Sequence, residues 1–270
     1  MEGYFVYVSD KLEEIRFGAP EKYQIFGTRE VVKWAFWRAV LAEFIGTLLF
    51  VFLGCASAVP IGDSIQPTIK IAFAFGLAIM SLIQMFGHVS GGHFNPAVSI
   101  GLAVIAGITP IRAAAYTLAQ IAGAIIGGLI LKGVTPIQHQ DKLAVTSVGA
   151  DVNAGQGLGV EIILTFVLVF VIAATTDADR PNFETASLKI GLTVTMLHMS
   201  SITYTGSSMN PARSLGSAVA SNSYGYHWIY WIGPIVGGCL ATIIYKYIYS
   251  PYRGAISKED AVNKLCKLQL

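Results

Sequence analysis

The sequence predicts an all-α membrane protein with six transmembrane helices and two re-entrant half-helices in an inverted repeat. Three observations support this fold class: a composition too apolar for a soluble chain, six long windows with few charges, and motifs that occur once in each half. Of the 270 residues, 54% are hydrophobic and only 13% are charged, about half the usual charge content. With a mean hydropathy of +0.60, the chain is expected to use lipid as its outer solvent.

The charge-poor windows are the candidate spans. Each is long enough to cross a bilayer core of about 30 Å. They cover residues 39–57, 69–87, 113–131, 160–176, 186–204 and 228–249. Because the number of spans is even, both termini are expected on the same side of the membrane.

The distribution of Lys and Arg predicts which side that is. Lys70, Lys132 and Lys142 are the basic residues expected on the outer side, and Arg213 belongs to neither side, which leaves fourteen of the eighteen on the inner side. This asymmetry follows the positive-inside rule. Both termini are therefore predicted to be cytoplasmic, and no cleavable signal peptide is expected.

The spans divide the chain into five parts. We expect a cytoplasmic N-terminal tail over 1–36, a first repeat over 37–135, an extracellular connecting loop over 136–158, a second repeat over 159–250 and a cytoplasmic C-terminal tail over 251–270. In the first tail, Asp10 and Glu13 have the spacing of a capping box and predict a short helix. The tail composition fits a solvated or interfacial segment, or a gate that closes the cytoplasmic mouth with Tyr4, Phe5 or Tyr7.

Several function classes are disfavoured by the composition and the motifs. A net charge of +2 is small for a nucleic-acid-binding surface, and three cysteines are too few for a disulfide framework. We find no P-loop, no dinucleotide-binding motif and no nucleophile with its base, so neither a cofactor nor an enzymatic activity is predicted. A structural membrane or junction protein, or a membrane enzyme, stays an alternative at this point.

The two halves of the chain share their motifs. Glu43-x-x-x-Thr47 recurs as Glu161-x-x-x-Thr165, and the glycine pairs of 123–127 recur at 233–237, where they predict close helix packing. The longest shared motifs are Asn95-Pro96-Ala97 and Asn210-Pro211-Ala212, each four residues after a glycine. Since each half holds three spans, the second half must enter the membrane from the opposite side. This inverted repeat is common in transport proteins.

Each Asn-Pro-Ala motif predicts the start of a helix. Asparagine favours the N-cap position and proline the first helical position. The apolar stretches that follow, 97–105 and 212–220, are long enough to cross only half of the membrane. Two half-helices that enter from opposite faces would meet at the midplane, where irregular backbone is tolerated only if it is buried or lines water. The pattern therefore predicts a pore.

The chemistry at the point where the half-helices meet predicts which molecules and ions the pore conducts. Two positive helix ends converge there, and each Asn side-chain oxygen can cap its own helix while its amide donors face the lumen. A water molecule that accepts from both amides cannot also accept from its neighbours in a single file. This interrupts proton conduction, and the converging dipoles repel cations.

At these residues the sequence resembles the aquaporin family, also called the major intrinsic proteins. The resemblance runs from about residue 35 to residue 251. The stretches 35–44, 87–93 and Asn210-Pro211-Ala212-Arg213-Ser214 are similar to its water-selective, vertebrate-type and brain-type members. The resemblance implies a six-helix bundle with one pore in each subunit of a homotetramer, most naturally in the plasma membrane, with water as the substrate and the lipid bilayer as the other partner.

The resemblance also implies an outer selectivity filter. Its four positions carry over to Phe75, His198, Ser207 and Arg213. The alternatives are a packing role for Phe75 and His198 and a structural pairing role for Arg213. The glycerol-conducting branch has an aromatic residue in place of Ser207, a glycine in place of His198 and an aspartate in place of Ser214. We therefore predict a passive water-selective channel, with a channel for glycerol or another small neutral solute as the alternative.

Four further polar residues need an assignment. The buried carboxylates Glu43 and Glu161 could form an acid and base pair, but the resemblance implies that they support the loops before the half-helices. His88 and His93 lie five residues apart with no cysteine or carboxylate nearby, which is poor spacing for metal ligands, so no metal site is predicted. Both histidines are candidates for the cytoplasmic vestibule, and loop packing is the alternative for His88.

Overall fold

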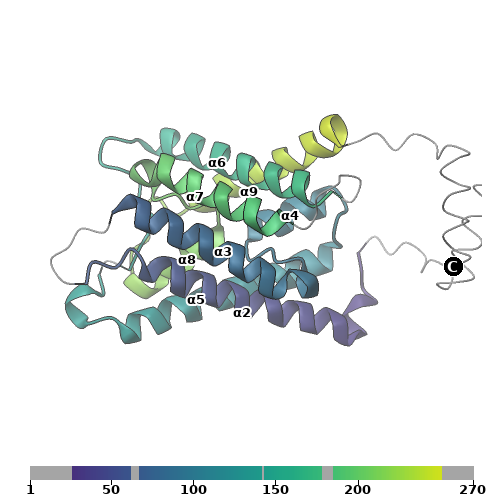
Figure 1. Ribbon diagram of the computed structural model, residues 1–270, viewed down its shortest axis with the longest axis horizontal. Helices are drawn as coiled ribbons and strands as arrows, with labels where there is room; N and C mark the ends of the chain where they lie inside the picture. The colour runs from purple at the N-terminus through teal and green to yellow at the C-terminus, as the bar shows by residue number, and fades with distance from the viewer. Residues whose placement is uncertain (1–25, 62–66, 142, 178–184, 251–270) are drawn as a thin grey trace, which may run out of the picture. The chain divides into compact units, whose positions relative to one another are not determined.

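The computed structural model describes residues 26–61, 67–141, 143–177 and 185–250, and these contain helices and no strands (Figure 1). The α-helices are α2 (Trp34–Ala56), α3 (Thr68–Ser90), α4 (Pro96–Val104), α5 (Pro110–Val134), α6 (Ala154–Thr175), α7 (Ala186–Thr205), α8 (Pro211–Ser221) and α9 (Ile229–Ile244). The shorter elements are the 3₁₀ turns η1 (Glu30–Val32) and η2 (Ile137–His139) and the π-helical end of α9, η4 (Tyr245–Tyr249). The helix expected at Asp10, the aromatic gate and the C-terminal tail lie outside the described residues.

The six expected spans correspond to α2, α3, α5, α6, α7 and α9. In the described part of the chain, five helices are long and apolar enough to cross a membrane: α2, α3, α5, α6 and α9 with η4. α7 has 20 residues, which span about 30 Å, but it carries Lys189, His198 and several hydroxyl groups. The predicted all-helical class is confirmed.

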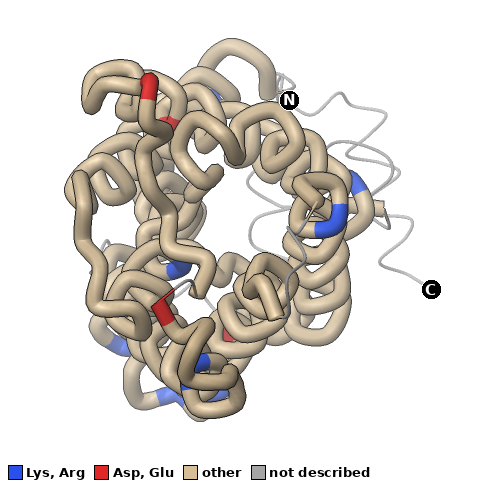
Figure 2. The backbone as a smooth tube through the Cα atoms, turned by 90° about the vertical axis from the view of Figure 1, so that its left-hand side faces the viewer, with Lys and Arg blue, Asp and Glu red and all other residues tan. Residues whose placement is uncertain are grey.

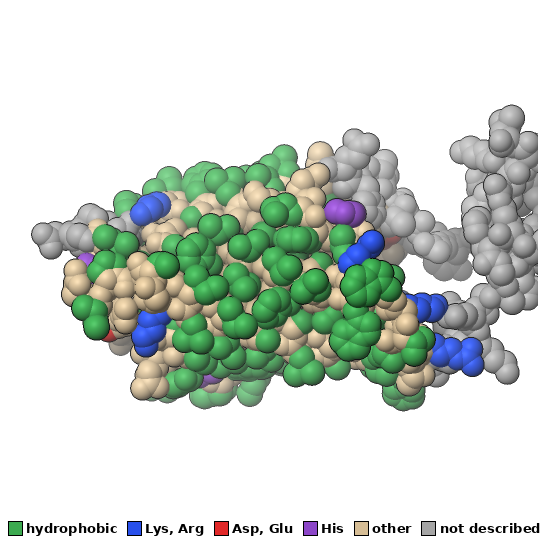
Figure 3. Space-filling view, turned by 90° about the horizontal axis from the view of Figure 1, so that it is seen from below, with side chains coloured by type: hydrophobic (Ala, Val, Ile, Leu, Met, Phe, Trp, Pro, Cys, Tyr) green, Lys and Arg blue, Asp and Glu red, His purple; other side chains and the backbone are tan. Residues whose placement is uncertain are grey.

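Apolar side chains cover the outside of these helices. Figure 3 shows a face on which hydrophobic side chains occupy the middle while Lys and Arg lie toward its ends. Seen end-on, the helices form a ring of backbone with few charged residues in it (Figure 2). The face in Figure 3 agrees with a surface that faces lipid along its middle and polar surroundings at its ends.

Helices α6 and α2 begin before the boundaries that the sequence predicts. α6 begins at Ala154, so the connecting loop expected over 136–158 ends at Asn153. The Asn153 side chain accepts from the Gln156 backbone N–H, and the Gln156 side chain accepts from the Asn153 backbone N–H, both at 2.9 Å. The spacing of Asn153 and Gln156 is that of a capping box, and it would have predicted this helix start from the sequence. At the other end of the chain, α2 begins at Trp34, three residues before the expected boundary at residue 37.

The two half-helices begin where the motifs predict. α4 has 9 residues and α8 has 11, or about 14 and 17 Å of helix. Asn95 Oδ1 accepts from the backbone N–H of Ala97 at 2.9 Å, and Asn210 Oδ1 accepts from that of Ala212 at 3.0 Å. In each helix, the proline occupies the first turn, where its missing N–H costs nothing.

The helices pair in a way that repeats between the halves. α2 packs on α5 in the first half and α6 packs on α9 in the second, while α3 and α7 join the halves. Each half-helix packs against the last helix of the other half: α4 lies on α9, and α8 lies on α5. The inverted repeat is therefore present in the packing as well as in the sequence, and neither half-helix is held by its own repeat alone.

Glycines make the close helix crossings possible. A Cβ atom at Gly123 of α5 would overlap the carbonyl oxygen of Phe44 in α2, and one at Gly237 of α9 would overlap that of Ile162 in α6. The half-helices make similar glycine contacts: Gly101 lies against the carbonyl of Gly238, and Gly216 lies against the carbonyl of Ala124. These contacts let backbones approach where larger residues would separate them.

We expect Gly123→Ala to destabilise the protein, because the added methyl group meets a backbone oxygen that cannot move away. The expected loss is about 1–3 kcal/mol of unfolding free energy, the usual cost of overpacking. Gly133→Ala, in the same helix, is the matched control, since nothing lies within 4 Å of its added Cβ. Thermal unfolding of the two purified variants in detergent checks this, and equal midpoints would contradict the close-packing role.

Candidate conducting pore

A buried carboxylate holds the loop between α3 and α4. Glu43 is fully buried, and its two oxygens accept from the backbone N–H groups of His93 at 2.9 Å and Phe94 at 2.6 Å. They also accept from Ser90 Oγ at 2.6 Å and Gln120 Nε2 at 2.8 Å. The carboxylate therefore satisfies loop donors that have no helical partner.

Glu161 does the same for the loop between α7 and α8. It is fully buried and accepts from the backbone N–H groups of Ser208 at 2.9 Å and Met209 at 2.8 Å, and from Thr205 Oγ1 at 2.6 Å. Because the oxygens of Glu43 and Glu161 are occupied by donors of their own loops, their geometry suits loop support and not acid–base chemistry.

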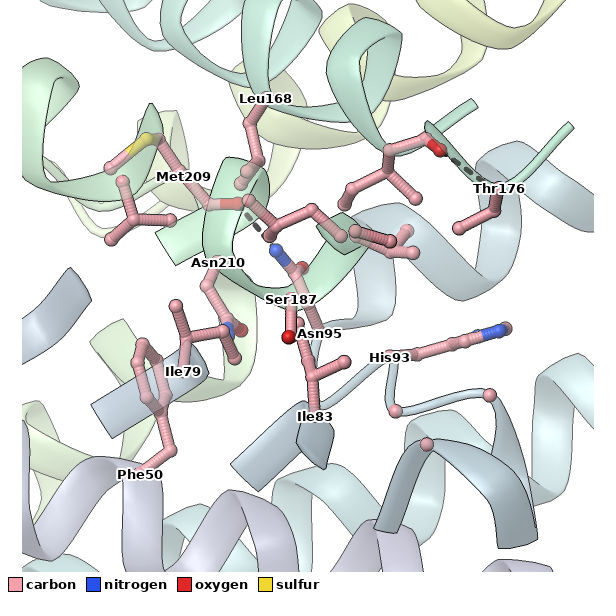
Figure 4. Close-up of a pocket in the computed structure, with 18 of the residues that line it drawn as sticks. Phe50, Ile79, Ile83, His93, Asn95, Leu168, Thr176, Ser187, Met209 and Asn210 are labelled. Atoms are coloured by element: carbon pink, nitrogen blue, oxygen red, sulfur yellow. Dashed lines mark hydrogen bonds between the residues drawn. The ribbon is translucent and has the colours of Figure 1, made fainter. Parts of the chain in front are cut away.

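The two loops are joined to each other through the asparagines. Asn95 Nδ2 donates to the carbonyl of Met209 at 2.8 Å (Figure 4). In the same way, Asn210 Nδ2 donates to the carbonyl of Phe94 at 2.8 Å. Phe94 and Met209 have φ values of 48° and 53°, in the left-handed region that is unfavourable for residues other than glycine. One hydrogen of each Asn amide is used in this cross-link, which leaves the other for the lumen.

Both asparagines line a cavity of about 580 Å³. It reaches from His88, Thr176 and Ser187 at one end to Phe75, His198 and Arg213 at the other. Between them, much of the wall is apolar and is formed by Phe50, Ile79, Ile83, Leu102, Leu168 and Ile172. Figure 4 shows Ile79, Ile83, Asn95 and Asn210 among the residues that line the cavity. A small polar molecule in this cavity meets hydrogen-bonding groups at a few positions only.

Three of the four predicted filter residues come together at one end of the cavity. The rings of Phe75 and His198 are stacked, with centroids 4.6 Å apart and planes at 17°. The Arg213 guanidinium lies over the Phe75 ring, 4.9 Å from its centroid. None of the three is more than 3% exposed. The Phe75 ring therefore contacts both the imidazole and the guanidinium, and this cluster of three side chains is the candidate constriction.

The constriction keeps unused hydrogen-bonding groups. His198 Nδ1 lies 2.9 Å from the carbonyl of Val194, which can only accept, so Nδ1 carries the proton and Nε2 is an acceptor without a protein partner. Arg213 Nη1 donates to the carbonyl of Ala144 at 2.8 Å, and Arg213 Nε has no partner. These two buried atoms are an acceptor and a donor that the protein itself leaves unpaired.

Ser207, the fourth predicted filter residue, is placed differently. It is fully buried, and it is not among the residues that line the cavity. Its Oγ accepts from Ser201 Oγ of α7 at 3.0 Å, so the hydroxyl is directed toward that helix. By contrast, nothing in the sequence indicated Ala144, because this residue contacts Arg213 through its backbone carbonyl, a group that every residue has.

The two predicted vestibule histidines have different surroundings. His88 is exposed and lines the cavity at the end that includes Ser187. His93 is buried beside Asn95, with Nδ1 3.0 Å from Ser99 Oγ and its ring edge-on to Tyr116. In the described residues, no group of three or more His, Cys, Asp or Glu side chains could hold a metal ion.

Comparison with known proteins identifies the family. The family model described as "Major intrinsic protein" matches residues 30–245, which is most of the chain. The chain belongs to the major intrinsic protein family. It is 46% identical to human Aquaporin-1 over 230 residues, which cover 82% of this chain and 86% of that protein. It is 45% identical to human Aquaporin-5 over 238 residues, with 87% and 90% covered.

A solved structure supports the fold of this major intrinsic protein. The X-ray structure of the aquaglyceroporin from Plasmodium falciparum matches with a TM-score of 0.73 at 26% identity, covering 80% of this chain and 98% of that one. Members of the family are membrane channels, and the aquaporin relatives are transporters rather than enzymes. This agrees with carboxylates whose oxygens are all engaged by their own loops.

We expect Glu161→Gln to destabilise this family member, because the new amide group places a donor against backbone donors of the second loop. The loss should be about 1–3 kcal/mol, the cost of leaving a buried donor unpaired. Thermal unfolding measures it. Glu30→Gln is the matched control, since that carboxylate is 23% exposed and pairs with Arg112, where an amide oxygen can still accept. An unchanged midpoint for Glu161→Gln would rule out the supporting role.

Proposed function

We propose that this chain is a passive water-selective channel that moves water down osmotic gradients and excludes protons and ions. The observation that carries the proposal is the constriction of Phe75, His198 and Arg213, which leads into a cavity lined by both helix-capping asparagines. The relatives support it, since the chain is 45–46% identical to human Aquaporin-1 and Aquaporin-5.

Water selectivity begins at the constriction. A water molecule there donates to His198 Nε2 and accepts from the guanidinium of Arg213, whereas the Phe75 ring limits the width. A carbon chain finds no continuous apolar wall beside these groups. The glycerol alternative predicts a wider constriction with an apolar side, and the stacked Phe75 and His198 rings do not favour it.

Proton exclusion takes place at the midplane. The N-terminal ends of α4 and α8 meet there, joined through their loops, and each carries the positive end of a helix dipole. A water oxygen between Asn95 and Asn210 accepts from their free amide hydrogens and cannot accept from the next water in the file. The broken chain of hydrogen bonds stops proton transfer, and the dipoles repel cations.

The membrane context completes the proposal. The chain would form a homotetramer in the plasma membrane, with the repeats 37–135 and 159–250 inside the bilayer and both termini in the cytoplasm. Exposed apolar residues such as Leu41, Leu77 and Leu192 on three different spans give lipid and neighbouring subunits an apolar surface. Mass determination by light scattering tests the tetramer, and protease accessibility of the tails in sealed vesicles tests the orientation.

The decisive test is osmotic. Proteoliposomes that contain the purified chain are mixed with sucrose in a stopped-flow instrument, and shrinkage is followed by light scattering. Rapid shrinkage relative to empty liposomes is expected. With glycerol as the osmolyte, the vesicles should shrink and then show no channel-dependent reswelling. Shrinkage at the rate of empty liposomes would refute the channel, and rapid reswelling would favour the glycerol alternative.

We expect Arg213→Val to retain water flux and to admit protons or cations, because Arg213 is the one Lys or Arg among the residues that line the cavity. The first repeat already carries Val98 at the equivalent position. The leak should rise by about tenfold or more, since charge repulsion in a site of low dielectric amounts to several kcal/mol. A pH-sensitive dye and ion-flux measurements check this, and an unchanged leak would argue against the role.

We expect the double variant Phe75→Ala, His198→Gly to pass glycerol or urea. Removing both stacked rings widens the constriction, while the asparagine cross-link at the midplane is not touched. The permeability to these solutes should be about tenfold or more above that of the natural chain, because pore diameter is what excludes them. A double variant that folds and conducts water yet rejects both solutes would mean that the constriction is elsewhere.

A further inference from the structure

The first turn of each half-helix carries a buried serine at the same place. Ser99 and Ser214 each lie four residues after the asparagine, and both are fully buried. Each is bonded to the residue two positions before its asparagine: Ser99 Oγ lies 3.0 Å from His93 Nδ1, and Ser214 Oγ lies 2.6 Å from Ser208 Oγ. The two hydroxyl groups therefore close equivalent loops onto equivalent helices.

Each of the two serines also accepts a hydrogen bond from one further side chain, and the repeats differ in where that donor comes from. In the first repeat, Gln120 Nε2 of α5 donates to Ser99 Oγ at 3.0 Å. The equivalent position of α9 is Pro234, because Tyr116 and Tyr230 lie four residues earlier and make equivalent hydrogen bonds. Their hydroxyl groups donate to the carbonyls of Ser90 and Thr205, the last residues of α3 and α7. Proline has no side-chain donor. The second repeat therefore lacks a donor from its own scaffold.

Thr146 supplies that donor from outside the repeat. It lies in the loop between η2 and α6, is 3% exposed, and its Oγ1 donates to Ser214 Oγ at 2.8 Å. The same loop is fixed again at Gly149, whose N–H donates to the carbonyl of Tyr204 at 2.9 Å. This loop is therefore attached to the end of α7 and to the start of α8.

The loop also holds the filter arginine. Two residues before Thr146, the carbonyl of Ala144 accepts from Arg213 Nη1 at 2.8 Å. Ala144 has a φ of 56°, which is unfavourable for a residue with a side chain and persists only where the surroundings hold it. The nearest side-chain attachment after Ala144 is the hydrogen bond from Thr146 to Ser214.

We propose that Thr146 is a positioning residue for the selectivity filter, although it does not line the cavity. Its hydrogen bond to Ser214 keeps the Ala144 carbonyl in place, and that carbonyl keeps the Arg213 guanidinium over Phe75. The inference rests on the proposed function as a water channel. It adds a residue from the connecting loop to the groups that decide which solutes pass.

The test compares Thr146→Val, which has the same shape without the hydroxyl, with Thr146→Ser, which keeps the hydroxyl. In proteoliposomes, Thr146→Val should raise the ratio of urea to water permeability by about two- to tenfold, the range that corresponds to the loss of one hydrogen bond. Thr146→Ser should keep the natural ratio. An unchanged ratio in Thr146→Val, or an equal rise in Thr146→Ser, overturns the proposal.

Two further variants distinguish the positioning of Arg213 from a general loosening of the half-helices. Thr242→Val is the matched control, because Thr242 is equally buried and its hydroxyl donates to the carbonyl of Gly101 on the other half-helix at 2.9 Å. Its ratio should equal that of the natural chain, and a rise would overturn the proposal. In an Arg213→Val background, Thr146→Val should add nothing, since its effect passes through Arg213. A further rise in that background also overturns it.

If Thr146→Val does not fold, Ser214→Ala breaks the same hydrogen bond from the other side and should raise the ratio similarly. No rise in Ser214→Ala then overturns the proposal. Failure of the proposed function is distinguishable, because the natural chain itself would not conduct water. A natural chain that conducts water, with variants that keep its selectivity, refutes the role of Thr146 alone.

Discussion

Each of the two loops that enter the membrane is organised around one buried carboxylate. Backbone N–H groups at that depth have no water to pair with, and leaving them unpaired costs several kcal/mol. Glu43 and Glu161 accept these donors, so the carbonyl groups of Phe94 and Met209 can turn toward the opposite loop and accept from its asparagine. The facing ends of α4 and α8 depend on this arrangement, and so does the position of Arg213, which lies in the first turn of α8.

The repeat builds a symmetric frame, and the two ends of the cavity differ where the symmetry is broken. Judged from the matched helix ends Ser90 and Thr205, His198 of α7 corresponds to Ile83 of α3, and Phe75 of α3 corresponds to Ile190 of α7. All four line the cavity. One end therefore carries an aromatic ring and an imidazole where the other carries two isoleucines. The cluster of Phe75, His198 and Arg213 is present at one end only, while the midplane remains nearly symmetric.

Local patterns predicted most of the fold, and contacts between distant segments account for what they missed. The spans, the half-helices and the asparagine caps follow from apolar length and from Asn-Pro pairs, which act within a few residues. The orientation of Ser207 depends on Ser201 of a neighbouring helix, and the Ala144 carbonyl is a group that every residue possesses. Thr146 meets a partner 68 residues away and has no counterpart in the first repeat, so neither spacing nor symmetry indicates it.

The exchange of half-helices between the repeats bears on how the chain assembles during synthesis. α4 packs on α9, and the Asn95 amide pairs with a carbonyl that lies 114 residues later in the chain. When only the first repeat has left the ribosome, α4 has neither its partner helix nor its cross-link. Its contacts are then limited to those within its own repeat, such as the packing of α4 on α5 and the hold of Glu43 on the loop before it. The facing pair of helix ends needs both repeats, so the complete pore cannot form before the second repeat is made.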